Sequence, residues 1–131
     1  MDYPTVQQLF DLSGQTALVT GGARNLGFDM ALALAEAGAD VVITSRTLAN
    51  ARKSASLIAE RTGRRVLPLE LDVCEEEQAS ATIDSCLAEF GKLDIVLANA
   101  GIAPLTKGGP RQAFVDAGVK DPTLYAASPQ L

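Results

Sequence analysis

One short segment, residues 20–27 (TGGARNLG), constrains the fold of this chain more than any other. It follows a β-rich run, residues 15–20 (QTALVT), and precedes an apolar helical stretch, residues 25–37, that Gly38 ends. A helix that starts directly after a glycine-rich turn points its first N–H groups and a partial positive charge toward that turn. Strand, glycine turn and helix in this order are typical of a phosphate-binding loop, although the same glycines also suit a plain tight turn.

Three further β-rich runs follow, and a helical stretch separates each run from the next. The runs are residues 40–45 (DVVITS), 65–71 (RVLPLEL) and 93–98 (LDIVLA). Alternating strands and helices with short connections predict a parallel sheet with helices on both faces. Pro68 cannot donate a ladder hydrogen bond, so the third strand should lie at a sheet edge, as it does in the strand order 3-2-1-4. The sequence therefore predicts a three-layer α/β/α fold with a parallel sheet of about four strands.

The two later helical stretches show apolar residues at helical spacing. Thr47 can cap the first of them and Gly63 ends it, with Leu48, Ala51, Ala55 and Ile58 on one face. Gly91 ends the second, whose apolar positions are Ala79, Ile83, Leu87 and Phe90. Asp72 and Glu75 predict a capping box at the start of that second helix.

Composition excludes several classes of function. The net charge is -5 and the chain has no basic run, which argues against a nucleic-acid partner. The longest apolar stretch, residues 31–35, is far too short to span a membrane. The chain has no histidine, so a histidine-based catalytic triad is excluded and no metal site is predicted. The first twelve residues lack the pattern of a secretory signal, so a cytoplasmic protein is expected.

Three motifs resemble those of one enzyme family, the short-chain dehydrogenases/reductases. Residues 20–27 resemble the family's glycine motif, in which a threonine and a glycine precede two further glycines. Residues 99–101 (NAG) come after the fourth strand and resemble its second signature. Residues 72–73 (DV) after the third strand resemble the pair that contacts adenine. The resemblance covers residue 9 to about residue 104, which would form an NAD(P)-binding Rossmann-like unit, 1–104.

The resemblance implies which residues would bind a dinucleotide cofactor. They lie in the glycine loop, at the end of the second strand, and after the third and fourth strands. The predicted cofactor-binding residues are Gly21, Arg24, Asn25, Leu26, Gly27, Ser45, Arg46, Asp72, Val73, Asn99, Ala100 and Gly101.

Asn25 departs from the family motif, which has a glycine at this position. Asparagine tolerates the left-handed backbone conformation better than other residues with a side chain, so the turn can still form. Its side chain nevertheless occupies space through which the backbone would approach a pyrophosphate. Weakened cofactor affinity is therefore one expected consequence, and loss of binding is the alternative.

The residues after the second strand favour NADP(H) over NAD(H). An NAD-specific unit carries Asp or Glu at this point to bind the ribose 2′-hydroxyl, and this chain has Thr44, Ser45 and Arg46 instead. Arg46 can meet a 2′-phosphate with paired, charge-assisted hydrogen bonds, and Arg24 in the loop could approach the same phosphate. Both arginines could equally be solvated surface charges, and use of both dinucleotides is the alternative. The absent carboxylate also disfavours an S-adenosylmethionine-dependent methyltransferase.

The family's catalytic residues are not found in this sequence. The resemblance implies a Tyr-x-x-x-Lys pair with a nearby serine, and an asparagine in the helix after the fourth strand. The two tyrosines here are Tyr3 and Tyr125, and Pro129 rather than lysine stands four residues after Tyr125. We therefore predict that this chain by itself has no catalytic residue. The resemblance implies that complete relatives move hydride between NAD(P)(H) and a carbonyl or alcohol.

The last part of the chain, residues 105–131, reads as an irregular, loop-rich tail or a truncation scar. Only residues 111–119 could form a short helix, and no fifth strand is recognisable. A sheet that lacks its later strands would expose an apolar edge, which predicts association of copies through that edge. The alternative to a truncated oxidoreductase is a non-catalytic module or partner subunit that holds the dinucleotide.

Overall fold

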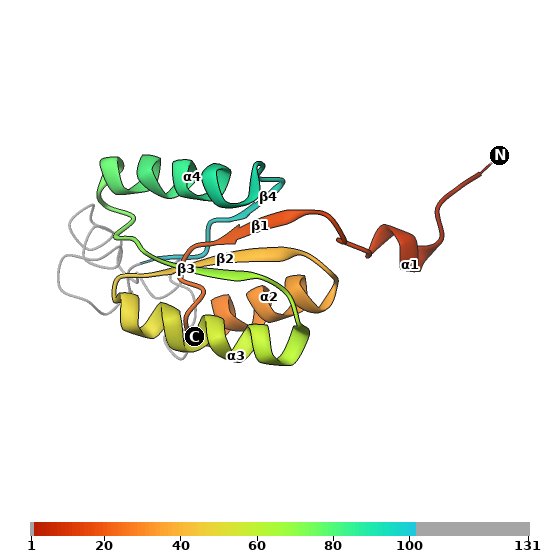
Figure 1. Cartoon of the computed structure of the whole chain (residues 1–131), viewed down its shortest axis with the longest axis horizontal. Coiled ribbons are helices and arrows are strands. Elements are labelled where there is room, and N and C mark those ends of the chain that lie inside the picture. Colours follow the sequence, from red (N-terminus) through yellow and green to blue (C-terminus); the bar gives the residue numbers. More distant parts are fainter. Residues whose placement is uncertain (1, 102–131) are drawn as a thin grey trace, which may run out of the picture. The chain divides into compact units, whose positions relative to one another are not determined.

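The computed structural model describes residues 2–101, nearly all of them in the unit Met1–Ala100. Figure 1 shows a parallel sheet with helices on both faces. In chain order the elements are α1 (Val6–Leu9), β1 (Thr16–Val19), α2 (Asn25–Glu36), β2 (Asp40–Ser45), α3 (Leu48–Thr62), β3 (Val66–Glu70), α4 (Glu76–Phe90) and β4 (Ile95–Leu97). The predicted tail 105–131, with its short helix at 111–119, lies outside the described residues.

The sheet has the strand order β3-β2-β1-β4, and every pair is parallel, as predicted. Within the described residues β3 is an edge strand that pairs with β2 alone, and its Pro68 stands opposite Ile43. A proline is tolerated there because the outer side of an edge strand has no neighbour that needs its missing N–H. The prediction that Pro68 marks an edge is confirmed.

Two apolar layers hold the helices against the sheet. Because successive strand residues point to opposite faces, β1 and β2 are buried on both sides and read as continuous apolar runs. Figure 1 shows α2 and α3 on one face of the sheet and α4 on the other. The first layer contains Val19, Ala31, Ala35, Val41, Ile43, Ala55 and Ile58, and the second contains Leu18, Val42 and Cys86.

The predicted capping box at the start of α4 is wrong. The helix begins at Glu76, and the side chain of its N-cap, Glu75, makes no capping hydrogen bond. Asp72 lies four residues before the helix, too early to cap it. Its carboxylate accepts from the N–H of Cys74 at 3.0 Å, and its own N–H donates to Oε1 of Gln78 at 2.9 Å. The residue therefore shapes the turn between β3 and α4.

Two further features bear on the predictions about membranes and association. None of the described helices is long and apolar enough to cross a bilayer. In residues 2–101, β4 pairs with β1 alone, and Val96 in β4 is 54% exposed. Association of copies through this edge stays a prediction.

Candidate functional site

The predicted site residues gather at the carboxyl ends of the four strands. Gly21 follows β1, Ser45 ends β2, Asp72 follows β3 and Asn99 follows β4. The connections through α2 and α3 run along one face of the sheet, and the connection through α4 returns along the other to place β4 beside β1. The strand order therefore reverses between β1 and β4. Open α/β sheets bind ligands in the crevice at such a point.

The loop after β1 takes left-handed backbone turns at two positions. Gly21 has φ of 66°, and Asn25, the first residue of α2, has φ of 54°. Asn25 is the one residue other than glycine with a positive φ among residues 2–101. The prediction that asparagine would accept the left-handed conformation here is confirmed. The loop thus keeps the turn although it lacks the middle glycine.

The segment after β4 braces this loop. The amide nitrogen Nδ2 of Asn99 donates to the carbonyl oxygens of Thr20 at 3.2 Å and Gly21 at 3.3 Å. In return, Oγ1 of Thr20 accepts from the backbone N–H groups of Asn99 and Ala100, both at 3.1 Å. Four hydrogen bonds therefore hold the two loops together at the carboxyl ends of β1 and β4.

Packing at the loop excludes side chains at the motif glycines. A β-carbon on Gly27 would overlap the carbonyl oxygen of Gly21 and crowd the amide of Asn99. A β-carbon on Gly21 would lie 3.1 Å from Cα of Ala100. Residues from two motifs that lie far apart in the sequence therefore form one packed unit, which consists of Gly21, Gly27, Asn99 and Ala100.

Two residues that support the loop, Thr44 and Ser54, were missed by sequence reasoning. Oγ1 of Thr44 accepts from the N–H of Gly21 at 3.3 Å, and the Thr44 carbonyl accepts from the N–H of Gly22 at 3.1 Å. The hydroxyl of Ser54 on α3 donates to the carbonyl of Ala23. A signal existed for Ser54, since it lies on the helix face of Ala51 and Ile58 and is a polar residue there. Thr44 similarly interrupts an apolar strand.

Several predicted site residues are exposed around this braced loop. Arg24, Asn25 and Arg46 are exposed, while Ser45 and Asp72 are half-buried and Gly101 is exposed. Two exposed residues are apolar, Leu26 at 61% and Val73 at 45%. Within residues 2–101, neither Arg24 nor Arg46 forms an ion pair with a carboxylate. Their charges are therefore not neutralised by the described part of the chain.

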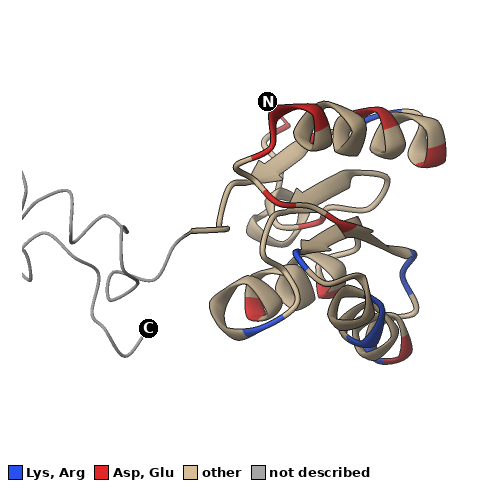
Figure 2. Ribbon diagram, turned by 90° about the vertical axis from the view of Figure 1, so that its left-hand side faces the viewer, with Lys and Arg blue, Asp and Glu red and all other residues tan. Residues whose placement is uncertain are grey.

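The charges of the helices differ between the two faces of the sheet. Helix α3, which follows Arg46, carries three cationic residues and one acidic one. Helix α4 on the opposite face carries four acidic residues and no cationic one. Figure 2 shows this separation, with blue on α3 and red on α4. An anion at the carboxyl end of β2 would lie on the more positive side of the described unit.

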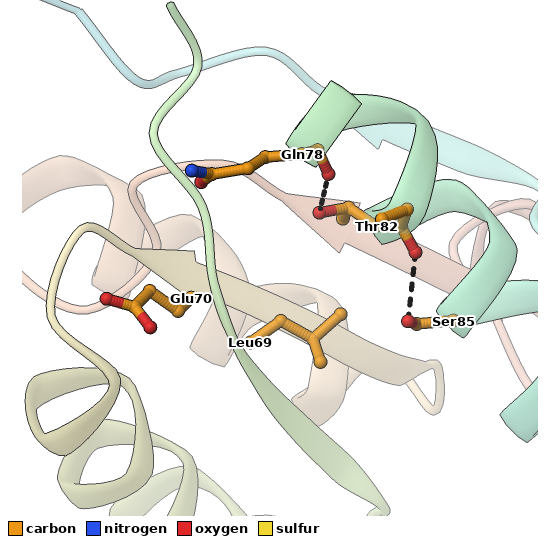
Figure 3. A pocket seen from close by; sticks show the side chains of 6 residues that line it. Leu69, Glu70, Gln78, Thr82 and Ser85 are labelled. Carbon is orange, nitrogen blue, oxygen red and sulfur yellow. Dashed lines mark hydrogen bonds between the residues drawn. The ribbon is translucent and has the colours of Figure 1, made fainter. Parts of the chain in front are cut away.

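A separate hollow lies between β3 and α4, away from the loop (Figure 3). It measures about 360 Å³, and its lining contains none of the predicted cofactor residues. The hydroxyls of Thr82 and Ser85 in its wall donate to carbonyls of their own helix, those of Gln78 and Ala81. These two hydroxyls are therefore already satisfied within α4. No cluster of three metal-binding side chains occurs in residues 2–101.

The sequence pattern of the short chain dehydrogenases matches residues 15–121. The chain belongs to the short chain dehydrogenase family. The match contains both loops described above and continues past position 104, where the resemblance was predicted to end. The family assignment and the Rossmann-like fold predicted from the sequence are thus confirmed.

Curated members of the short chain dehydrogenase family align with most of this chain. Peroxisomal 2,4-dienoyl-CoA reductase of Danio rerio is 42% identical over 89 residues, which are 68% of this chain and 30% of the reductase. The 3-oxoacyl-acyl-carrier-protein reductase FabG of Chlamydia trachomatis is 38% identical over 91 residues, 70% of this chain and 37% of FabG. The chain thus spans about a third of the length of these relatives.

Solved structures of short chain dehydrogenases share the fold. A short-chain type dehydrogenase/reductase from Mycobacterium marinum superposes with a TM-score of 0.75 at 36% identity, over 86% of this chain and 46% of the other. L-sorbose reductase from Gluconobacter frateurii, solved with NADPH and L-sorbose, has a TM-score of 0.69 at 32% identity. That match covers 72% of this chain and 36% of the reductase.

Proposed function

We propose that this chain binds a nicotinamide dinucleotide at the carboxyl ends of β1 to β4, with NADP(H) preferred and NAD(H) as the alternative. The observation that carries the proposal is the braced loop between β1 and α2. Asn99 and Thr44 hold its backbone from either side, so the loop that leads into α2 is fixed at the carboxyl ends of the strands. The N–H groups and partial positive charge of a helix N-terminus stabilise a pyrophosphate at such a position.

The preference for NADP(H) rests on charge at the end of β2. Arg46 is exposed, unpaired within the described residues, and followed by the cationic helix α3. No carboxylate stands at the end of β2, where an NAD-specific unit would have one. Arg24, also exposed, is the second cation proposed to face the 2′-phosphate. The NADPH in the structure of L-sorbose reductase supports this choice of cofactor.

The remaining proposed contacts with the dinucleotide come from the residues after β3 and β4 and from the start of α2. Val73 offers an exposed apolar side chain against which an adenine ring would lie, and Asp72 beside it holds the turn. Ala100 and Gly101, which follow β4, are proposed to border the dinucleotide next to the braced loop. Leu26, exposed at the start of α2, would cover the dinucleotide from the opposite side.

We further propose that the chain is the cofactor-binding part of an NAD(P)-dependent oxidoreductase, whose reaction moves hydride between nicotinamide and a carbonyl or alcohol. The described residues supply the cofactor cradle, and this chain alone is proposed not to turn over substrate. The second candidate is a module that holds the dinucleotide without chemistry. Oxidation of NADPH by this chain with carbonyl substrates would contradict the non-catalytic proposal.

The test is a titration of the full chain with NADPH and NADH, followed by nicotinamide fluorescence. Arg46→Glu should weaken NADPH binding about tenfold or more, the size of a lost charge-assisted contact, and should weaken NADH binding much less. Arg61→Glu makes the same charge change in the last turn of α3 and should leave both affinities unchanged. Absence of binding at millimolar cofactor would overturn the proposal.

A further inference from the structure

The hydroxyl of Ser54 joins α3 to the glycine loop across 31 positions of sequence. Ser54 is 7% exposed, lies in the second turn of α3, and donates to the carbonyl oxygen of Ala23. Ala23 precedes Arg24, the N-cap residue of α2. The bond therefore reaches the point of the loop directly before one of the two cations of the proposed site.

This contact differs from those of other hydroxyls on the described helices. Thr62, Thr82 and Ser85 each donate to the carbonyl four residues earlier in their own helix, which is the usual partner for a hydroxyl in a helix interior. Ser54 instead donates to a different element. A buried hydroxyl with this geometry contributes to the placement of that element, because its bond is lost if helix and loop move apart.

The same helix also follows the second cation of the site. Helix α3 begins at Leu48, two residues after Arg46, and Thr47 between them donates its N–H to Oγ of Ser45 at 3.2 Å. The Ser54–Ala23 bond therefore connects the helix that follows Arg46 with the loop residue that precedes Arg24. A displacement of α3 from the loop would change the separation of the two guanidinium groups.

We propose that Ser54 is a positioning residue for recognition of the 2′-phosphate, and that it sets the discrimination between NADP(H) and NAD(H) through the spacing of Arg24 and Arg46. Ser54 does not contact the phosphate itself. A dinucleotide without a 2′-phosphate gains little from the two cations, so its affinity depends less on their spacing. This inference rests on the proposed function.

The experiment measures binding of two fragments, 2′,5′-ADP and 5′-AMP, to the full chain by calorimetry. The fragments differ in the 2′-phosphate. The Kd of 5′-AMP divided by the Kd of 2′,5′-ADP therefore measures how strongly the protein recognises that phosphate. Ser54→Ala should reduce that ratio about fivefold, the size of one net hydrogen bond, mainly by weakening 2′,5′-ADP. Ser54→Thr keeps a hydroxyl and should restore the ratio. Ser85→Ala, which removes a hydroxyl bonded within its own helix, is the matched control.

The outcomes separate this inference from the proposed function. Equal losses for both fragments would show that Ser54 supports the loop in general, and would overturn the inference. An unchanged ratio in Ser54→Ala would overturn it as well. If Ser54→Ala does not fold, judged by circular dichroism, Ser54→Cys keeps the volume with a poor donor and should show the same fall in ratio. Wild-type protein that binds neither fragment would contradict the proposed function itself, and the inference with it.

Discussion

The side-chain amide nitrogen of Asn99 lies 3.3 Å from the carbonyl oxygen of Gly21, and 78 positions of sequence separate the two residues. The same nitrogen donates to Thr20. The side-chain amide of Asn99 therefore holds the backbone of the glycine loop at two adjacent carbonyls, and we propose that it acts on the cofactor site in this way. The family's two sequence signatures meet in this one contact.

Asn99→Asp should destabilise the protein, because a carboxylate places an acceptor against two carbonyl oxygens. We expect the free energy of unfolding in urea to fall by about 1–3 kcal/mol, the cost of leaving such groups unsatisfied. Asn50→Asp, on an exposed position of α3, makes the same change away from the loop and should have a small effect. Equal stabilities of Asn99→Asp and the wild type would contradict the bracing role.

Gly27→Ala should also destabilise the protein, although alanine normally stabilises a helix relative to glycine. Alanine within a helix is favoured over glycine by roughly 1 kcal/mol, so helix propensity alone predicts a gain. At Gly27, however, the added β-carbon would overlap the carbonyl oxygen of Gly21. We expect a net loss of about 1–3 kcal/mol in urea unfolding and weaker NADPH binding. A stabilised variant would show that the loop moves away from α2 at little cost.

Asn25→Gly and Asn25→Ala should differ in their effect on the stability of the protein. With φ of 54°, position 25 suits glycine better than asparagine and asparagine better than alanine. We expect Asn25→Ala to lower the unfolding free energy by about 1 kcal/mol and Asn25→Gly to leave it equal or higher. Because glycine removes a side chain from the path of the pyrophosphate, Asn25→Gly should bind NADPH more tightly in a fluorescence titration. Tighter binding by Asn25→Ala than by Asn25→Gly would contradict this account.

Asp94 should make stability depend on pH in the acid range. The backbone N–H of Thr16 donates to its carboxylate at 2.8 Å and, with Lys92 nearby, holds its pKa below the ordinary 3.8. A pKa lowered by folding stabilises the folded state above the unfolded value, and that stabilisation is lost as pH falls through the folded pKa. Urea midpoints of Asp94→Asn and the wild type should therefore differ at pH 6 and converge below pH 3.8. A difference that persists unchanged at lower pH would contradict a role for the charge.

Most of the fold follows from patterns within short stretches of the chain. Apolar runs of four to six residues predicted β1 and β2, and the glycines after α3 and α4 predicted where those helices end. Pro68 predicted the edge of the sheet because its missing N–H is a property of the residue alone. The capping box at Asp72 failed because a pattern of polar residues does not fix where a helix begins. The backbone N–H of Asp72, which Glu75 would bind in a capping box, donates instead to the side chain of Gln78, six residues after Asp72.

The loop motif predicted that Gly21, Asn25 and Gly27 would form a phosphate-binding turn, and Asn25 does take the left-handed conformation it requires. Local steric preferences were sufficient for this, since each acts within a few residues. Which groups brace the loop was decided by the tertiary structure. Thr44 and Ser54 meet it because the order β3-β2-β1-β4 places β2 beside β1 and α3 beside α2. These two hydrogen bonds join residues that are separated by 23 and by 31 positions of sequence. They depend on the arrangement of the strands and helices, which no local preference encodes.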